Sequence, residues 1–243
     1  MFIKIKNLTK IYNNYSAVND INFDIEKNET LGLLGPNGCG KTTTIGMLLG
    51  LISPSKGSII VENKDINTLK RDEILKRFNF ASPYVELPKK LTVRQNLEIY
   101  GRLYGVNDLF KRINEISKDL DIKIFFDRKT GELSSGQKNR VSLAKSLINK
   151  PEILLLDEPT ASLDPDIGDF VRSYIQDYKS KNKITILLAS HNMNEVERLC
   201  NSIIMMKSGK IIDRGTCSEL IQKHGRNNLE ETFLKLARSK DEF

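Results

Sequence analysis

Hydrophobic and polar residues follow two different patterns along this chain, and each pattern predicts a different kind of strand. Residues 3–6 alternate isoleucine with lysine, and residues 21–25 repeat the same two-residue period. Alternation predicts strands with one solvent-exposed face, arranged antiparallel at the N-terminal edge of the fold. Residues 153–156 are all apolar, and residues 184–188 are apolar except for Thr185, without alternation. Such runs are typical of strands that are covered on both faces in a parallel sheet.

The segments between these strands carry mostly helical periodicity. Residues 66–120 contain no long apolar strand run and show helical patterns near residues 73–78, 93–103 and 108–120. We therefore expect an α/β fold with a mostly parallel, βαβ-wound sheet, an N-terminal antiparallel β-subdomain and an inserted helical lobe over about residues 81–150.

The C-terminal part of the chain predicts a hairpin and closing helices. Two short apolar segments within residues 201–213 flank a turn at Ser208-Gly209, which indicates a β-hairpin. Closing helices are expected over about residues 216–239. Because no stretch rich in Pro, Gly or Ser divides the 243 residues, we expect a single domain that spans residues 1–243.

The segment that follows the apolar residues 30–34 has the spacing of a phosphate-binding loop, G-x-x-x-x-G-K-T. Glycines let the backbone wrap closely around an anion and direct successive N–H groups at it. Lys41 would add a compact positive charge for the β- and γ-phosphates, and Thr42 would add a hydroxyl ligand for Mg²⁺. The sequence therefore predicts a site for a nucleoside triphosphate with Mg²⁺, formed by Gly35, Pro36, Asn37, Gly38, Cys39, Gly40, Lys41 and Thr42.

Charge and cysteine content limit the partners and the compartment. Lys and Arg total 38 against 31 Asp and Glu, which gives a formal net charge of +7. The positive residues are dispersed, so no nucleic-acid partner is expected. The longest uncharged stretch, residues 42–55, is too short to span a bilayer, and residues 1–6 lack the apolar core of a secretory signal. Three scattered cysteines form neither a metal pattern nor a disulfide framework, which favours a reducing cytosol.

Two carboxylates stand at the end of the apolar run 153–156. Asp157 and Glu158 would lie at the C-terminal tip of a buried strand, where open parallel sheets hold their ligands. Asp157 can bind Mg²⁺ directly or through water, and Glu158 would orient or deprotonate the water that attacks the γ-phosphate. An acidic turn before Pro159 is the simpler alternative. The phosphate loop upstream favours the catalytic interpretation.

A second polar motif precedes another helix. Residues 134–137 read Ser-Ser-Gly-Gln, and the S-x-x-Q spacing is that of a helix capping box. Taken alone, the motif would be an ordinary helix start. Gly136, however, lies 21 residues before Asp157, and His191 lies 34 residues after Asp157, at the end of the next apolar run. We therefore expect His191 to contact phosphate or Glu158, with a structural histidine as the alternative.

In their order, these motifs resemble those of the nucleotide-binding subunit of an ATP-binding cassette (ABC) transporter, over essentially the whole chain. Residues 35–43 resemble the Walker A motif of that family and residues 153–158 its Walker B motif. Residues 133–137 resemble its signature, residues 161–164 its D-loop, and His191 its switch histidine.

The resemblance implies an ATP site completed by a second subunit. Tyr12 resembles the aromatic residue that stacks on adenine, although a rim aromatic that packs locally is the alternative. A head-to-tail dimer is implied, either of two copies of this chain or with a related ATPase subunit. Each ATP would lie between the Walker A residues of one subunit, Thr43 included, and the signature residues of the other, which are Ser134, Ser135, Gly136 and Gln137.

Two positions depart from the family pattern. The family normally has a glutamine after the strand that leads into the helical lobe, whereas residues 80–84 read Phe-Ala-Ser-Pro-Tyr. Ser82 is the candidate for a shorter oxygen ligand there, and Gln95, further on, is expected on a helix surface. Ser135 stands where the signature usually has glycine, so strain of order 1 kcal/mol would follow if that position required a positive φ. We expect weakened function at these positions and not its loss.

The resemblance implies an ATPase that couples ATP-driven dimer closure to transport through a separate transmembrane permease. It places the chain in the cytoplasm, at the inner face of the cell membrane. The tail, residues 229–236, resembles the C-terminal helix of exporter ATPases and indicates export, although any amphipathic closing helix would look similar. Two alternatives remain open, namely a soluble ABC ATPase that acts on nucleic acid or ribosomes and a low-turnover regulatory subunit that senses nucleotide.

Overall fold

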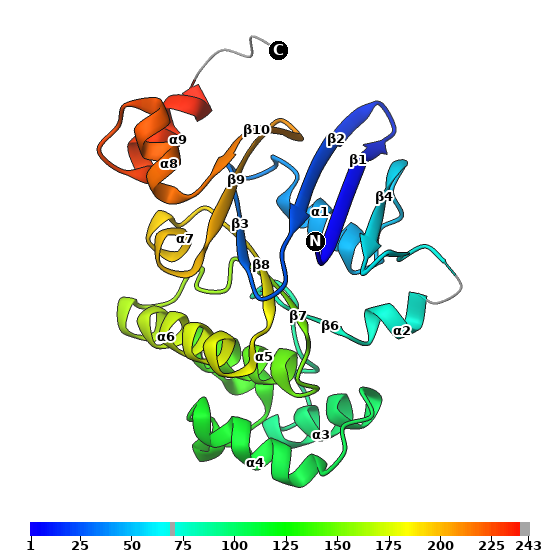
Figure 1. The fold of residues 1–243 in the computed structure, drawn as a ribbon. Coiled ribbons are helices and arrows are strands. Elements are labelled where there is room, and N and C mark those ends of the chain that lie inside the picture. Colours follow the sequence, from blue (N-terminus) through cyan, green and yellow to red (C-terminus); the bar gives the residue numbers. More distant parts are fainter. Residues whose placement is uncertain (69–70, 239–243) are drawn as a thin grey trace. The chain divides into compact units, whose positions relative to one another are not determined.

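The computed structural model describes residues 1–68 and 71–238 (Figure 1). The chain divides into two compact units. One unit consists of residues 1–75 together with residues 185–243, and the other consists of residues 76–184. Residue 239, the predicted end of the closing helices, lies outside the described residues.

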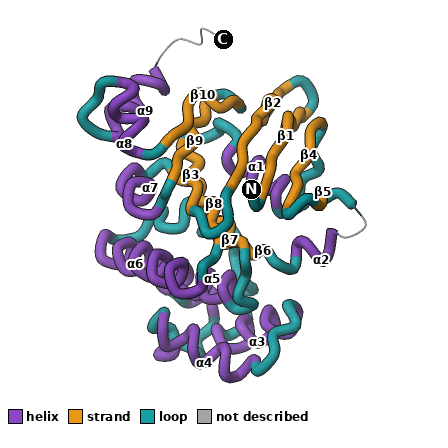
Figure 2. The backbone as a smooth tube through the Cα atoms, in the orientation of Figure 1, coloured by secondary structure: helices purple, strands orange, loops and turns teal. Residues whose placement is uncertain are grey.

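The first unit contains an antiparallel sheet with the strand order β2-β1-β4-β5 (Figure 2). The alternation of residues 3–6 and 21–25 determines which side chains are buried, because Ile3 pairs with Ile25 and their side chains are fully buried. This sheet confirms the predicted antiparallel β-subdomain. Its strands are β1 (Ile3–Tyr12), β2 (Tyr15–Ile25), β4 (Lys56–Val61) and β5 (Lys64–Asp65).

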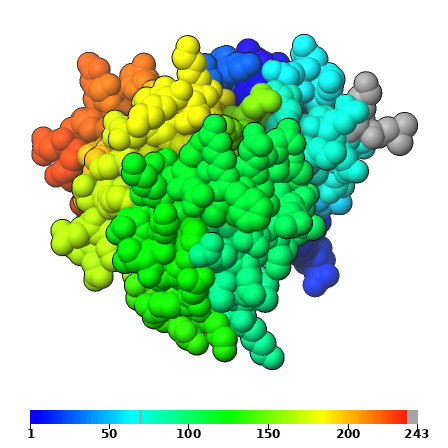
Figure 3. All heavy atoms as spheres, turned by 90° about the horizontal axis from the view of Figure 1, so that it is seen from below, coloured from blue at the N-terminus to red at the C-terminus, as the bar shows by residue number. Residues whose placement is uncertain are grey.

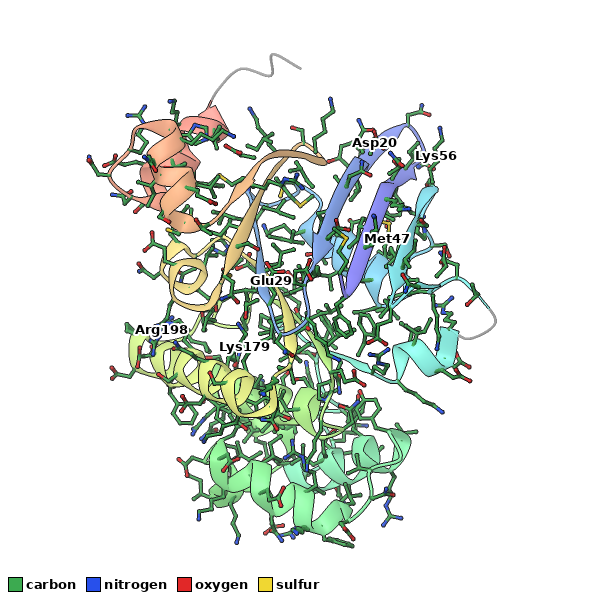
Figure 4. All side chains as sticks on the ribbon, in the orientation of Figure 1. Asp20, Glu29, Met47, Lys56, Lys179 and Arg198 are labelled. Atoms are coloured by element: carbon green, nitrogen blue, oxygen red, sulfur yellow. The ribbon has the colours of Figure 1, made fainter. Side chains whose placement is uncertain are left out.

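A second group of strands in the first unit has the order β10-β9-β3-β8, in which β3 is parallel to both β8 and β9. Glu29, labelled in Figure 4, precedes β3 and accepts hydrogen bonds from the Ser202 hydroxyl and from the N–H of Glu26, which fixes the start of β3 beside β9. The antiparallel pair of β9 and β10 confirms the predicted hairpin. The strands are β3 (Thr30–Leu34), β8 (Thr185–Ser190), β9 (Ser202–Lys207) and β10 (Lys210–Gly215).

The helices of the first unit bury apolar side chains against these strands. Met47 on the helix after β3, labelled in Figure 4, is fully buried. A separate core cluster joins Leu34 and Met205 of the strands to Val196, Leu220 and Leu229 of the later helices. The helices are α1 (Lys41–Leu48), α2 (Arg71–Leu75), α7 (Met193–Leu199), α8 (Cys217–His224) and α9 (Leu229–Arg238).

The second unit consists of two parallel strands and a group of helices. The strands β6 (Phe78–Ala81) and β7 (Ile153–Asp157) pair in parallel, and α5 packs against β6. Figure 3 shows one side of this helical segment, coloured green. Its helices are α3 (Val93–Leu103), α4 (Leu109–Asp119), α5 (Ser135–Leu147) and α6 (Pro165–Asn182), with short 3₁₀ turns at Lys123–Phe125 and Thr130–Glu132.

The sequence prediction is wrong near residues 73–78, where the first unit ends and the second begins. A helical segment was expected near residues 73–78, within a wholly helical stretch from residue 66, but α2 ends at Leu75 and Phe78 begins the strand β6. The four residues of β6 form no long apolar run, and their pairing with β7, not a local pattern, makes them a strand. No helix among residues 1–68 and 71–238 is long and apolar enough to cross a membrane.

Candidate functional site

The predicted phosphate loop connects β3 to α1 and closes around the side chain of Lys41. The ammonium group of Lys41 donates hydrogen bonds to the carbonyl oxygens of Gly35, at 2.6 Å, and Pro36, at 3.3 Å. The side chain is 6% exposed. A cation is thus fixed within a loop that leads into the N-terminus of a helix, and both features attract an anion.

The glycines of the loop are required by its geometry. Gly40 has a φ of +108°, and a Cβ at this position would lie 2.6 Å from the carbonyl oxygen of Ala17. A Cβ at Gly35 would lie 2.4 Å from the Cys39 sulfur. Gly38 has a φ of +79°, and a Cβ there would meet no atom within 4 Å among the residues that the structure describes. The loop is therefore tightly packed beneath Gly35 and Gly40 and open at Gly38, as a phosphate cradle requires.

Two tyrosines flank the turn between β1 and β2, and one of them contacts this loop. Tyr12, the predicted adenine-stacking residue, ends β1 and pairs with Tyr15 across a two-residue turn, and Lys10 lies 5.0 Å above its ring. The Tyr15 hydroxyl donates a hydrogen bond to the carbonyl oxygen of Gly38, at 3.4 Å. The sequence interpretation missed Tyr15. The short Asn-Asn turn between the two tyrosines is the signal that could have found it, because such a turn brings both rings to the same end of the hairpin.

His191 follows the last residue of β8 and is exposed. The buried residue before it, Ser190, donates a hydrogen bond to the Glu195 carboxylate at 2.6 Å, and its hydroxyl accepts one from the N–H of Asn192. Asn192 in turn caps α7. These bonds fix the backbone around His191, while the role predicted for its side chain stays a prediction.

In the second unit, Asp157 ends β7 and Glu158 follows it, and both carboxylates are buried. Glu158 has a φ of +53°, in the left-handed region that costs a non-glycine residue about 1–2 kcal/mol. Its carbonyl oxygen accepts a hydrogen bond from the N–H of Ala161, at 3.0 Å, which closes a turn through Pro159. A strained backbone at a buried carboxylate is frequent at functional sites.

The predicted capping box at the start of α5 is present. The Ser134 hydroxyl accepts from the N–H of Gln137, at 3.3 Å, and the Gln137 side chain accepts from the N–H of Ser134, at 3.1 Å. A Cβ at Gly136 would lie 2.6 Å from Cδ1 of Ile167, so this glycine allows α5 to approach α6. Ser135 is the first residue of α5 and has no positive φ. The strain considered for Ser135 is therefore absent.

The structure also places the two residues discussed for the missing glutamine. Ser82 is buried after β6, and its hydroxyl accepts a hydrogen bond from the N–H of Tyr84, at 3.3 Å. Gln95 lies exposed in the first turn of α3 and forms a capping box with Thr92, as expected for a helix-surface position. Its side-chain oxygen accepts from the N–H of Thr92, at 2.9 Å. The Gln95 side chain therefore caps the N-terminus of α3.

The candidate metal ligands are hard oxygen donors. Thr42 lies in the first turn of α1, and Asp157 ends β7. Within residues 1–68 and 71–238, no three His, Cys, Asp or Glu side chains gather as a metal site. Oxygen donors in small number fit Mg²⁺, which keeps several waters and relies on substrate phosphates for the rest of its shell.

Comparison with known proteins identifies the family. A family model described as "ABC transporter" matches residues 18–161. The ABC transporter ATP-binding protein NatA of Bacillus subtilis (strain 168) is 39% identical over 227 residues, 91% of each chain. A Nod factor export ATP-binding protein I of Burkholderia lata is 37% identical over 90% of this chain and 72% of its own. A probable sulfate/thiosulfate import ATP-binding protein CysA of Chlorella vulgaris is 34% identical over 97% of this chain and its own full length.

Solved structures agree in fold. The ATP-binding subunit of an ABC transporter has a TM-score of 0.88, with 23% identity, over 97% of this chain and 99% of its own. The ATP-binding cassette MJ0796, as a dimer in a post-hydrolysis state with ADP and Pi, has a TM-score of 0.80, with 27% identity, over 88% of this chain and 98% of its own. The predicted resemblance and fold class are thus confirmed. This chain belongs to the ABC transporter family, as one of its ATP-hydrolysing, ATP-binding subunits.

Proposed function

We propose that this chain powers an exporter, as a dimer of ATPase subunits attached to a separate transmembrane permease at the cytoplasmic face of the membrane. The observation that carries the ATP-dependent part is the loop closed around Lys41, where a buried ammonium group lies at a helix N-terminus. The names of the Nod factor export relatives support export. The name of the CysA relative supports import and is the competing direction.

The proposed nucleotide contacts follow from the loop. Backbone N–H groups of residues 35–43 would surround the phosphates, with Lys41 as the fixed cation. Thr42 and Asp157 would hold Mg²⁺, which when bound neutralises charge on the β- and γ-phosphate oxygens. Tyr12 would stack on the base. Because any base has a flat face, we expect little discrimination between ATP and GTP.

Hydrolysis requires a base for the attacking water, and Glu158 is the proposed one. Its carboxylate would accept a proton as the water oxygen bonds to the γ-phosphorus and the bond from the γ-phosphorus to the β–γ bridging oxygen breaks. ADP and inorganic phosphate are the products. His191 would contact the γ-phosphate or Glu158 through its imidazole.

The proposed dimer brings the start of α5 of one copy to the nucleotide of the other. Ser134 and Ser135 are exposed there, at the N-terminus of a helix of 13 residues that can receive an anion. The MJ0796 cassette, 27% identical to this chain, has been solved as a dimer with ADP and Pi, which supports a dimer here. ATP would join the two copies, and its hydrolysis to two mutually repelling anions would release them.

A cavity in the second unit is the proposed docking site of the permease. It has a volume of about 310 Å³ and lies beside the segment after β6, where Tyr84 is 73% and Val85 53% exposed. Leu133 and Leu163 add apolar wall to the same cavity. Exposed aromatic and aliphatic side chains beside a pocket fit the apolar face of a short helix from a permease loop.

We further propose that residues 1–243 act as one ABC ATPase domain, with a helical lobe over about residues 81–150 and closing helices from about residue 216. The lobe would carry most of the wall of the docking cavity, and Leu163 adds to that wall from outside the lobe. Movement of the lobe during dimer closure is what the permease would sense.

Direction and partner are tested together. The tagged chain is purified from its own host's membranes in mild detergent, the copurifying membrane protein is identified, and the pair is reconstituted in vesicles with ATP and Mg²⁺ on one side. Export predicts ATP-driven movement of the substrate away from the ATPase side, and a Glu158→Gln complex is the matched control without turnover. Movement toward the ATPase side, or copurification with RNA or ribosomes only, contradicts the proposal.

A further inference from the structure

Asn139 connects the helix of the signature segment to the loop that follows Glu158. It lies in the second turn of α5 and is 9% exposed. Its side-chain amide donates a hydrogen bond to the carbonyl oxygen of Pro159, with 2.6 Å between Nδ2 and the oxygen. Both residues belong to the second unit. The bond therefore joins two segments that lie 20 residues apart in sequence.

The carbonyl that Asn139 holds belongs to the residue directly after Glu158. The backbone of Glu158 has its left-handed φ of +53° and begins the turn closed by the bond from the N–H of Ala161. On the other side, Leu156 is fixed in β7 by its pairing with Ala81 of β6. A residue in a strained conformation keeps it only when its surroundings hold it from both sides. Asn139 provides a restraint on the C-terminal side.

We propose that Asn139 is a positioning residue for Glu158. By holding the Pro159 carbonyl, its amide restrains the turn after Glu158 and so orients the Glu158 carboxylate toward the reacting water. The orientation of this carboxylate then depends on the position of α5. This inference rests on the proposed role of Glu158 as the base. A general base depends steeply on its placement, so a shift of well under a bond length in the turn reduces turnover.

Asn139 also lines the proposed docking cavity. Asn139 and Ser142, on successive turns of α5, both line the cavity of about 310 Å³ together with Ser82 and Tyr84. Asn139 is thus common to the wall of the cavity and to the turn after Glu158. Ser142 lines the same wall, but the hydrogen bond to the Pro159 carbonyl comes from Asn139, so Ser142 supplies a matched control.

The simpler alternative is that Asn139 only satisfies a buried carbonyl. In that case its loss would lower the melting temperature and leave the turnover of the folded protein unchanged. A positioning role predicts the opposite separation, a loss of kcat with nucleotide binding intact, because no part of the Asn139 contact involves the phosphate loop.

The experiment compares three variants of the full chain in ATP and Mg²⁺. Asn139→Leu removes the donor at similar size, Asn139→Gln keeps an amide on a longer arm, and Ser142→Ala changes the neighbouring cavity residue. We expect Asn139→Leu to lower kcat about 10- to 100-fold, with the KM for ATP and the Kd for a fluorescent ATP analogue within about twofold of the parent. Asn139→Gln should regain part of the rate, and Ser142→Ala should match the parent.

A parental kcat in Asn139→Leu, or equal losses in kcat and in nucleotide affinity, would overturn the inference. If Asn139→Leu does not fold, Asn139→Asp tests the same point at identical size, because its ionised carboxylate cannot donate. Glu158→Gln is assayed in parallel. Turnover at the parental rate in Glu158→Gln would refute the proposed base and this inference together, whereas an inactive Glu158→Gln beside a normal Asn139→Leu would refute this inference alone.

Discussion

The ammonium group of Lys41 lies 2.6 Å from the carbonyl oxygen of Gly35 and donates a hydrogen bond to it across the phosphate loop. The first residue of α1 is thereby tied to the first residue of the loop. Lys41 is buried, and two of its hydrogen bonds go to backbone carbonyls of the loop itself. The loop therefore presents a cation whose place is set before ATP arrives.

Replacing Lys41 by alanine should abolish tight ATP binding. The variant loses a charge-assisted contact to the phosphates and a restraint on the loop, so we expect the Kd for a fluorescent ATP analogue to rise about 10- to 100-fold. Equilibrium titration of the analogue measures this change. Lys64→Ala removes an exposed lysine from β5 of the same unit and should bind like the parent. Parental affinity in Lys41→Ala would mean that the site is misplaced.

Glu158→Gln should separate binding from turnover. The amide has the size of the carboxylate but cannot accept a proton from water, so the variant should bind ATP and hydrolyse it at least about 100-fold more slowly. ATP then persists and the variant should accumulate as an ATP-bound dimer, which size-exclusion chromatography in ATP and Mg²⁺ detects. Glu132→Gln, at an exposed position of the same unit, is the control. A Glu158→Gln protein that stays monomeric in ATP would count against closure by ATP.

Ser135→Gly, which restores the usual family residue, should not stabilise the protein. Ser135 has no positive φ and begins α5, where glycine only adds freedom to the unfolded chain. We expect the free energy of unfolding in urea to fall by up to about 1 kcal/mol. Ser135→Ala, a better helix former, should stay within about 0.5 kcal/mol of the parent. A clear gain in stability from glycine would reveal strain at this position.

The sequence predicted those parts of the fold that have a local pattern. The alternation of apolar and polar residues predicted the antiparallel strands β1 and β2, and the apolar run 153–156 predicted β7. The periodicity missed the strand β6, which only the family resemblance implied, because its four residues include the polar Asn79. In the structure the Asn79 amide donates to the Asn149 side chain, at 2.9 Å, a partner 70 residues away. Tertiary contacts of this kind leave no periodic signal.

The candidate site divides in the same way. The phosphate loop and the Ser134–Gln137 capping box could be predicted because each is a short motif whose spacing follows from its own hydrogen bonds. The contact of Asn139 with Pro159 could not, because it depends on how α5 packs beside the end of β7. The backbone conformation of Ser135 could not be predicted from the sequence either, because φ at a helix start depends on the cap and not on residue type alone.

Lys145 should make the stability of the chain depend on alkaline pH. Burial lowers the pKa of Lys145 to about 8, and its ammonium group lies 5.3 Å from the centre of the Tyr100 ring. Between pH 8 and about 10.4 the unfolded chain holds a proton on this lysine that the folded chain releases, so the free energy of unfolding rises with pH across this window. Below about pH 8 the lysine is charged in both states, and the full cost of burying its charge lowers the stability of the fold. Lys145→Met, which removes the buried charge, should therefore gain more stability over the parent at pH 7 than at pH 10, by about 1–3 kcal/mol in urea unfolding. Lys138→Met, at an exposed position of α5, should follow the parent at both pH values, and a parallel response of Lys145→Met and the parent would show that Lys145 keeps its ordinary pKa in the folded protein.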